Sequence, residues 1–395
     1  MKRRTFTTGL CGCALAGALG GCRTAHETGP VVSGDASPGY RPNMNSDEAG
    51  LWLQSDEHER SVRASRARIR DKVAESFIKD VVCGLAHRYC PDLRSYILRV
   101  PLFNATCSPN GMVQVYSGLL LRARNEAQLA AVLGHEIGHY LKKHSLQRLR
   151  DTRNATDMSV VFGLVAGALG SPQGSQNLNL LLRELQIAAF SRDNEREADD
   201  LGLTMMSEAG YDPYEAAGIW KRLMDERKAS DEPLPEFDVF SATHPSEDER
   251  IETLTKAAEK RTRPAGGHLP NRLPQAIKAV RGIMLEDEIN LGHFKQSEKL
   301  FDMIIADGHD IGEVLYFKGE LYRRRGKHND DMAALGFYHE ACELPGAPPA
   351  AFRQVGLMRW RRDEKEVARE YFRRYLRVAP DAPDREMIRK YVEGA

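Results

Sequence analysis

Residues 133–139 read Leu-Gly-His-Glu-Ile-Gly-His, and this stretch sets the interpretation of the whole chain. Four residues advance an α-helix by about 400°, so His135 and His139 would project from the same helical face. Two neutral imidazoles at this spacing can bind one zinc ion, and the carboxylate of Glu136 stands where it can accept a proton from an activated water. Because such a short motif also occurs by chance, the alternative is a helix that carries two solvated histidines.

The flanking sequence predicts the helix that this motif requires. Asn125 is a suitable N-cap, and apolar residues recur at helical spacing through the motif. Gly134 and Gly138 lie inside the predicted helix, where each glycine costs about 1 kcal/mol relative to alanine. They predict that another backbone segment passes close to this face; simple tolerance of glycine is the alternative. His144 is predicted to be solvated, nearly opposite His135 around the same helix.

A hydrolytic zinc site needs a third protein ligand and one open coordination position. Glu195 is the candidate, within residues 191–199, which read Ser-Arg-Asp-Asn-Glu-Arg-Glu-Ala-Asp. Glu195 and Asp199 are again four residues apart, so one helix can direct both toward one point. Glu195 would bind the metal, and Asp199 would accept the free N–H of a ligand histidine. Taken alone, an acidic run more often marks a solvated helix face, which is the interpretation given to Glu197.

With these motifs, the chain resembles the zinc metallopeptidase family that includes the CAAX prenyl protease, the mitochondrial protease Oma and the bacterial β-barrel assembly-enhancing protease. That family pairs an HExxH helix with a downstream Glu-x-x-x-Asp helix introduced by Ser-Arg, as here. Further matches lie at residues 104–120, which include Asn-Ala, Pro-x-Gly and Gly-Leu-Leu, and at residues 243–251, which include His-Pro and Arg-Ile.

The resemblance implies a zincin-like (gluzincin) metallopeptidase domain that is mainly α with a small β-sheet. It implies one Zn2+ per chain, bound by His135, His139 and Glu195, with Glu136 as the general base and Asp199 behind the ligands. This assignment predicts hydrolysis of peptide bonds.

A strand is predicted just before the metal helix, where the side chains alternate and favour β structure. In zincins of this kind, an edge strand beside the metal helix offers unpaired backbone groups to which an extended peptide can add. A core hairpin without a role in substrate binding is the alternative. The predicted substrate strand consists of Met112, Val113, Gln114, Val115 and Tyr116.

Two downstream residues have open roles. Ser246 and Glu249 form the pattern of a capping box, so His244 would be held at the entrance of a helix. In relatives, a histidine at this motif approaches the zinc, and in some periplasmic members it fills the fourth position. His244 is therefore a fourth ligand, a donor to the oxyanion, or a packing histidine. Arg250 either donates to the site or pairs with a carboxylate.

The N-terminus resembles a bacterial lipoprotein signal. Basic residues 2–4 precede an apolar run that is too short to span a bilayer, and the run ends in Leu-Gly-Gly-Cys, with Cys22 as the lipidated residue. An ordinary signal peptide or an uncleaved anchor is the alternative, and Arg-Arg-Thr-Phe at residues 3–6 also resembles a twin-arginine signal. The predicted location is the periplasm, with the outer membrane favoured because Arg23, and no aspartate, follows Cys22.

Composition adds two constraints. The chain has 56 Lys+Arg and 56 Asp+Glu, so no basic excess predicts binding to nucleic acid. In an oxidising compartment, Cys83 and Cys90 can form a disulfide if the helix breaks before Pro91; free, buried thiols are the alternative.

The C-terminal part of the chain has the spacing of a helical repeat. Ala334 and Ala368 are separated by 34 residues, the tetratricopeptide (TPR) period, and so are Tyr338 and Phe372. Generic helical pairs are the alternative, and TPR arrays present concave surfaces to protein partners. The four segments predicted along the chain are a lipoprotein signal peptide, a flexible tether, a zinc metallopeptidase domain and an all-α TPR-like repeat domain, at residues 1–21, 22–54, 55–262 and 271–395.

The predicted function is that of a zinc-dependent metalloendopeptidase of the bacterial cell envelope, which cleaves misfolded or stalled envelope and outer-membrane proteins. Its partners would be protein or peptide substrates, the membrane through the lipid anchor, and the envelope assembly machinery through the repeats. The alternative is a non-proteolytic chaperone or assembly factor for outer-membrane proteins, with TPR-mediated binding and a latent zinc site.

Overall fold

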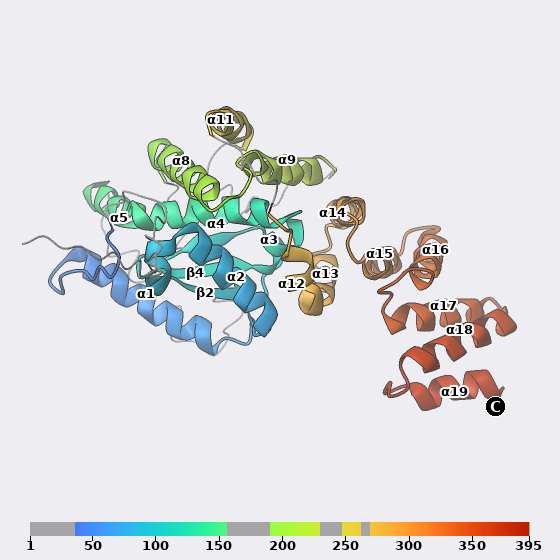
Figure 1. Cartoon of the computed structure of the whole chain (residues 1–395). Coiled ribbons are helices and arrows are strands. Elements are labelled where there is room, and N and C mark those ends of the chain that lie inside the picture. Colours follow the sequence, from blue (N-terminus) through green and yellow to red (C-terminus); the bar gives the residue numbers. More distant parts are fainter. Residues whose placement is uncertain (1–35, 156–189, 230–246, 262–268, 395) are drawn as a thin grey trace, which may run out of the picture.

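The computed structural model of the chain describes residues 36–155, 190–229, 247–261 and 269–394 (Figure 1). This part is mostly helical, with one four-stranded sheet. Helices cover the sheet, and an array of further helices extends away from it to the C-terminus. None of the described helices combines the length and the apolar character needed to cross a membrane.

The sheet has the strand order β1-β2-β4-β3. Strands β2 and β4 are parallel, and the other two pairs are antiparallel. Thr106 of β3 lies opposite Gln114 of β4, which sets the register of the β3–β4 hairpin. The strand bounds are β1 Arg68–Ile69, β2 Arg94–Leu98, β3 Ala105–Cys107 and β4 Met112–Tyr116.

Strand β4 is an inner strand, so the prediction that residues 112–116 offer a free edge to substrate is wrong. It pairs with β2 on one side and with β3 on the other. All five of its side chains are buried, as expected of a strand that is covered on both faces. The segment is a strand as predicted, but within the described part of the chain β3 ends the sheet on this side.

Different helices cover the two faces of the sheet. On one face lies α1 (Asp47–Ala64), whose Val62 packs with alternate residues of β2 and β4. The other face is covered by α2 (Lys72–Leu85) and α4 (Glu126–Leu141), whose apolar residues share a core with the intervening positions of the same strands. The short helix α3 (Ser117–Arg122) joins β4 to α4.

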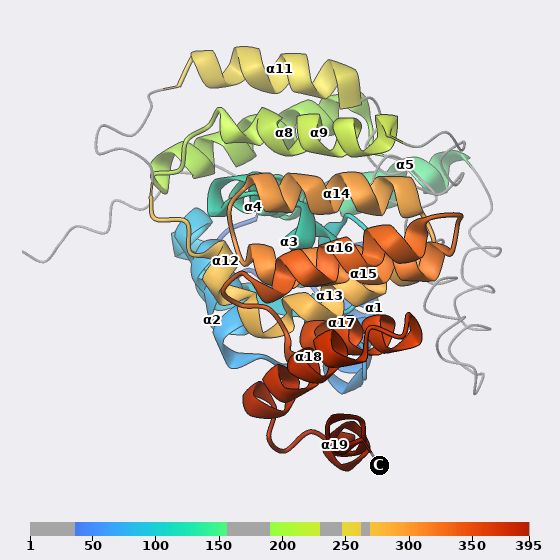
Figure 2. The same cartoon turned by 90° about the vertical axis from the view of Figure 1, so that its right-hand side faces the viewer.

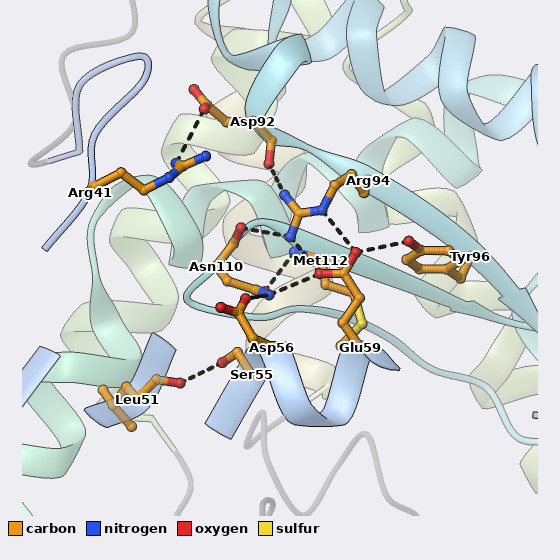
Figure 3. Close-up of polar contacts among 10 residues, drawn as sticks. All are labelled: Arg41, Leu51, Ser55, Asp56, Glu59, Asp92, Arg94, Tyr96, Asn110 and Met112. Carbon is orange, nitrogen blue, oxygen red and sulfur yellow. Dashed lines mark hydrogen bonds and ion pairs between the residues drawn. The ribbon is translucent and has the colours of Figure 1, made fainter. Parts of the chain in front are cut away.

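A buried network of polar side chains holds α1 on the sheet (Figure 3). The Glu59 carboxylate accepts hydrogen bonds from Arg94 at 2.6 and 2.9 Å, from the Tyr96 hydroxyl at 2.8 Å and from the Asn110 amide at 2.9 Å. Burial alone raises the pKa of the Glu59 carboxyl, but the hydrogen bonds from Arg94 and Tyr96 outweigh this effect, and the net pKa is lowered.

The residues before α1 are also part of the fold. The Ala36 N–H donates to the Leu141 carbonyl at the end of α4 at 3.0 Å, and the Ala36 carbonyl accepts from the Tyr89 hydroxyl at 3.1 Å. The expected tether, residues 22–54, therefore overlaps an ordered segment and the start of α1.

The two cysteines next to this segment form a disulfide. Helix α2 ends at Leu85, and the 3-10 helix η1 (His87–Asp92) contains Pro91, so the chain turns where the pairing requires it. Cys83 and Cys90 are bonded, with their Cα atoms 4.7 Å apart. Of the two alternatives left open by the sequence, the structure has the disulfide.

A second layer of helices stacks on the side of α4 that faces away from the sheet, as Figures 1 and 2 both show. This layer contains α8 (Arg192–Glu208), α9 (Glu215–Lys228) and α11 (Glu247–Glu259). Helix α8 runs along α4, and α9 contacts both α4 and α11.

The C-terminal helices form hairpins with a repeated internal contact. A Cβ on Gly319 would lie 2.5 Å from the ring of Tyr338, and a Cβ on Gly356 would lie 2.5 Å from the ring of Phe372. The same glycine–aromatic contact therefore recurs in two successive helix pairs. The helices are α12 Leu273–Ala276, α13 Lys278–Asn290, α14 Phe294–Ala306, α15 Ile311–Arg325, α16 Asp330–Cys342, α17 Pro349–Arg361, α18 Lys365–Val378 and α19 Arg385–Glu393.

The first of these helices share a hydrophobic core with the sheet domain. Apolar residues from Leu273 to Leu321 belong to the same buried cluster as those of α2, α4 and α9. A buried ion-pair triad reinforces this connection: Arg122 of α3 lies 2.6 Å from Glu226 of α9 and 3.1 Å from Glu288 of α13. A separate core begins further along, in α15 to α19.

Candidate active site

Two capped helices carry the candidate site. The Asn125 side chain accepts the Gln128 N–H at 2.9 Å and starts α4, as predicted. The Ser191 hydroxyl accepts the Asn194 N–H at 3.1 Å and starts α8. These caps fix where each helix begins and therefore which residues face the neighbouring helix.

The glycines of α4 allow α8 to approach closely. A Cβ on Gly134 would lie 3.2 Å from the Cα of Gly202, and a Cβ on Gly138 would lie 2.9 Å from the carbonyl oxygen of Ala198. The prediction of a close backbone neighbour at these glycines is confirmed. This approach brings the acidic face of α8 against the histidines of α4.

The three predicted ligands converge on one point. The Nε2 atoms of His135 and His139 are 3.0 Å apart, and the Glu195 carboxylate oxygens lie 3.5 Å from the first and 3.4 Å from the second. A zinc tetrahedron with bonds of about 2.0–2.1 Å has edges of about 3.3 Å. Their ligand atoms all lie within 4.8 Å of one another, and the three residues are buried. This donor set fits one Zn2+.

Asp199 and Arg250 stand behind His135. Asp199 Oδ1 lies 2.8 Å from His135 Nδ1, the nitrogen that faces away from the other ligands. Arg250 donates two hydrogen bonds to the same carboxylate, at 2.6 and 3.1 Å, and its guanidinium lies over the Trp220 ring. Of the two roles open to Arg250, the structure has the pairing with a carboxylate, so it acts on the site through Asp199.

His144 is buried beside His139, and the prediction that it is solvated is wrong. Its Nδ1 lies 2.8 Å from His139 Nδ1, and its Nε2 lies 3.2 Å from Glu197. Helix α4 ends at Leu141, and Lys143 adopts a left-handed conformation with φ 54°, so the chain folds back before α5 (His144–Ala155) begins. The prediction of a solvated His144 assumes one continuous helix through this point.

An aromatic ring covers His139. Phe190, the residue before the cap of α8, stacks on the imidazole with a centroid distance of 4.0 Å and an interplanar angle of 21°. The Arg148 guanidinium lies over the Phe190 ring at 4.4 Å. Sequence reasoning did not identify Phe190, because no spacing rule relates a loop residue to the motif.

Glu136 lies between the ligands and the sheet edge. Burial and, to a smaller extent, the nearby Glu195 carboxylate raise the pKa of the Glu136 carboxyl to about 8, although Arg250 and a backbone hydrogen bond from Cys107 of β3 act in the opposite direction. A divalent cation at the three ligands would favour the ionised form of this carboxyl. The contact with Cys107 places Glu136 next to β3.

A small cavity opens beside His139. Its lining comes from α1, the β3–β4 hairpin, α4 and the start of α5, and includes Leu51, Cys107, Pro109, His139 and Tyr140. It therefore borders both a ligand histidine and the edge strand.

Comparison with known proteins supports this geometry. Residues 71–258 match the model of peptidase family M48. This segment is therefore similar to M48 peptidases. The three ligands, Glu136 and Asp199 all lie inside the matched segment, while the predicted lipidation residue Cys22 and the predicted site residue His244 lie outside the described residues.

Several curated metalloproteases are similar to the chain. It is 28% identical to the β-barrel assembly-enhancing protease of Escherichia coli over 277 residues, 68% of this chain and 54% of the relative. It is 35% identical to the mitochondrial metalloendopeptidase OMA1 of Schizosaccharomyces pombe over 170 residues, which are 42% of this chain and 48% of the relative. It is 32% identical to the Arabidopsis thaliana protein of the same name over 161 residues, which are 41% of this chain and 30% of the relative. The chain spans about half the length of the curated relatives it matches.

Proposed function

We propose that this protein is a zinc-dependent metalloendopeptidase of the bacterial cell envelope. The observation that carries the proposal is the convergence of His135, His139 and Glu195 from two helices, with Glu136 beside them. The match to the M48 family model and the metalloprotease names of the similar proteins support the same reaction class.

Each residue has a defined part in this mechanism. Zinc, when bound to the three ligands, supplies Lewis acidity that polarises the scissile carbonyl and makes an attacking water more acidic. The Glu136 carboxylate accepts the proton from that water and delivers it to the departing amine. Asp199 accepts the Nδ1–H of His135, which leaves Nε2 of that ring free to bind the metal. Arg250 holds Asp199 in place by two hydrogen bonds.

Strand β3 is the proposed substrate-binding edge, in place of residues 112–116. It is the last strand on its side of the described sheet, and its Cys107 contacts the general base Glu136. An extended peptide that added to β3 would lie beside α4. The cavity lined by Cys107, Pro109 and His139 would receive a substrate side chain there.

His244 remains a proposal as a fourth ligand or as a donor to the oxyanion. Helix α11 begins at Glu247, three residues after it in the sequence, and Arg250 of the same helix binds Asp199.

The location and the substrates are also proposals. A lipidated Cys22 would anchor the protein in the periplasm, with the outer membrane favoured. The name of the Escherichia coli relative refers to β-barrel assembly. We therefore propose misfolded or stalled envelope proteins as substrates, recruited through TPR-like hairpins at residues 271–395. A non-proteolytic assembly factor with a latent zinc site is the second candidate.

The decisive experiment combines metal analysis with a cleavage assay on an unfolded protein. The wild type is expected to contain one zinc per chain, and Glu195→Ala is expected to lose it. Glu136→Gln should retain zinc and lose about 10²–10⁴-fold in cleavage rate. Glu252→Gln, an exposed change on α11, is the control.

Two results would count against the proposal. If Glu136→Gln cleaves protein at the wild-type rate, Glu136 is not the general base. The second result is that the wild type binds zinc and supports envelope assembly, and that Glu136→Gln supports envelope assembly equally well. That result would favour the non-proteolytic assembly factor.

A further inference from the structure

The two ligand histidines are held by different partners. His135 faces the carboxylate of Asp199, whereas His139 Nδ1 lies 2.8 Å from Nδ1 of His144. His144 is completely buried, and its Nε2 lies 3.2 Å from Glu197 Oε2. Glu197 pairs in turn with Lys142 at 2.7 Å. A chain of polar contacts therefore leads from one ligand to the protein surface.

We propose that His144 is a positioning residue that fixes the tautomer and the ring orientation of His139 for metal binding. The proposal rests on the zinc site proposed above. Nε2 of His139 faces the other two ligands, so its proton belongs on Nδ1 when a metal is bound. That N–H can donate only to an unprotonated Nδ1 of His144. The proton of neutral His144 is then on Nε2, where it donates to Glu197.

The plane of the His139 ring is fixed independently. Phe190 stacks on one face of the imidazole, and Arg148 of α5 lies over Phe190. Because α5 also begins with His144, one helix supports both the edge and the face of the ligand ring. Partners of this kind orient metal-bound histidines and raise the basicity of the ligand nitrogen.

The contact requires the turn between α4 and α5. In a continuous helix, a residue five positions after His139 would point about 140° away from it. Lys143 reverses the chain with φ 54°, and its Nζ lies 3.1 Å from Glu48 and 3.6 Å from the centre of the Tyr40 ring. The segment before the catalytic helices thus stabilises the turn that delivers His144.

Two substitutions at His144 test the proposal in the full-length protein. His144→Asn keeps an acceptor at the position of Nδ1, whereas His144→Phe fills the volume without one. His144→Phe is expected to bind zinc about 10–100-fold more weakly and to change the absorption spectrum of the cobalt(II)-substituted protein. His144→Asn is expected to stay within about threefold of the wild type. Zinc affinity is measured by competition with a chelator, on protein whose folding is checked by circular dichroism.

The control is Tyr211→Phe, which removes a buried hydrogen bond to Glu126 at the other end of α4. It should lower stability without changing zinc affinity. A wild-type zinc affinity in His144→Phe overturns the proposal, and so does an equal loss in His144→Asn. If His144→Phe does not fold, Glu197→Ala carries the test: about threefold to tenfold weaker binding is expected, and an unchanged affinity overturns the proposal.

These readouts are separate from proteolysis. A wild type that binds zinc but cleaves no protein would refute the proposed function, and the comparison of zinc affinities at His144 would still stand.

Discussion

Gly138 of α4 lies against Ala198 of α8 with no room for a side chain between them: a Cβ on Gly138 would be 2.9 Å from the Ala198 carbonyl oxygen. Together with the contact between Gly134 and Gly202, it sets the distance between the helix that supplies two ligands and the helix that supplies the third. The glycines of the motif are therefore part of the metal site although they bind nothing.

Gly138→Ala is expected to weaken zinc binding and to lower the free energy of unfolding by about 1–3 kcal/mol, because α8 must move away from α4. The gain in helix propensity, about 1 kcal/mol, opposes this change and does not offset it. Gly84→Ala in α2 is the matched control, since a Cβ there meets nothing within 4 Å. Denaturant unfolding and metal titration of both variants test the prediction. Equal behaviour of the two would show that the close approach is unimportant.

Arg250→Met is expected to destabilise the protein by about 3–5 kcal/mol, because it leaves the buried Asp199 carboxylate without its guanidinium partner. Adding Asp199→Asn should restore most of that stability and should not restore zinc affinity, since His135 would still lack an anionic acceptor. Thermal unfolding and chelator competition separate these two effects. Full recovery of zinc affinity in the double variant would contradict the assigned role of Asp199.

The Glu59 network predicts an acid-dependent loss of stability. The hydrogen bonds from Arg94 and Tyr96 lower the pKa of Glu59 in the folded protein below its value of 4.5 in the unfolded chain. Its contribution to stability is therefore complete above the unfolded pKa and is lost as the pH falls through the folded pKa. Glu59→Gln should flatten the fall in unfolding free energy below about pH 4.5.

That measurement is made on Glu195→Ala, so that loss of zinc in acid does not contribute. An unaltered pH dependence in Glu59→Gln would assign the acid sensitivity to other carboxyls.

The left-handed turn at Lys143 predicts opposite outcomes for two substitutions. Lys143→Gly should preserve zinc affinity, because glycine adopts φ 54° without strain. Lys143→Val should weaken it and lower stability by about 1–2 kcal/mol, because a β-branched residue resists this conformation and would displace His144. Zinc titration with thermal unfolding checks both. Similar affinities in the two variants would mean that the turn does not control the site.

Helical periodicity directly relates residues four apart, so the sequence predicts that His135 and His139 share a face. Glu195 lies on another helix, and only the resemblance to a metallopeptidase family connects it to the two histidines. Gly134 and Gly138 also predict part of the site. Because each glycine lowers the stability of the helix, a close contact with another segment is expected to compensate. His144 shows the limit of the same rule: the helix ends two residues before Lys143, and a lysine gives no signal of a left-handed turn. Helical spacing therefore predicts which way a side chain faces only for residues that belong to the same unbroken helix.

The sheet could not be ordered from sequence for a different reason. Residues 112–116 were correctly predicted to be a strand, but whether a strand is inner or outer depends on a partner elsewhere in the chain. Here β4 pairs with β2 on one side and with β3 on the other, so that among the described strands β3, and not β4, ends the sheet on this side. Likewise, the ordered segment that includes Ala36 owes its structure to α4 and Tyr89, contacts that local composition does not encode.

The triad of Arg122, Glu226 and Glu288 has a mechanical consequence for how a large substrate would be handled. Because it is buried in a core common to α3, α9 and α13, the first C-terminal helices are fixed to the sheet domain and cannot swing toward the metal site as a hinged unit. A substrate protein bound by these first helices would therefore be held at a fixed distance from the metal site. Only an unfolded segment long enough to cover that distance would reach the site of cleavage. The fixed arrangement would therefore favour unfolded substrates over compact, folded ones.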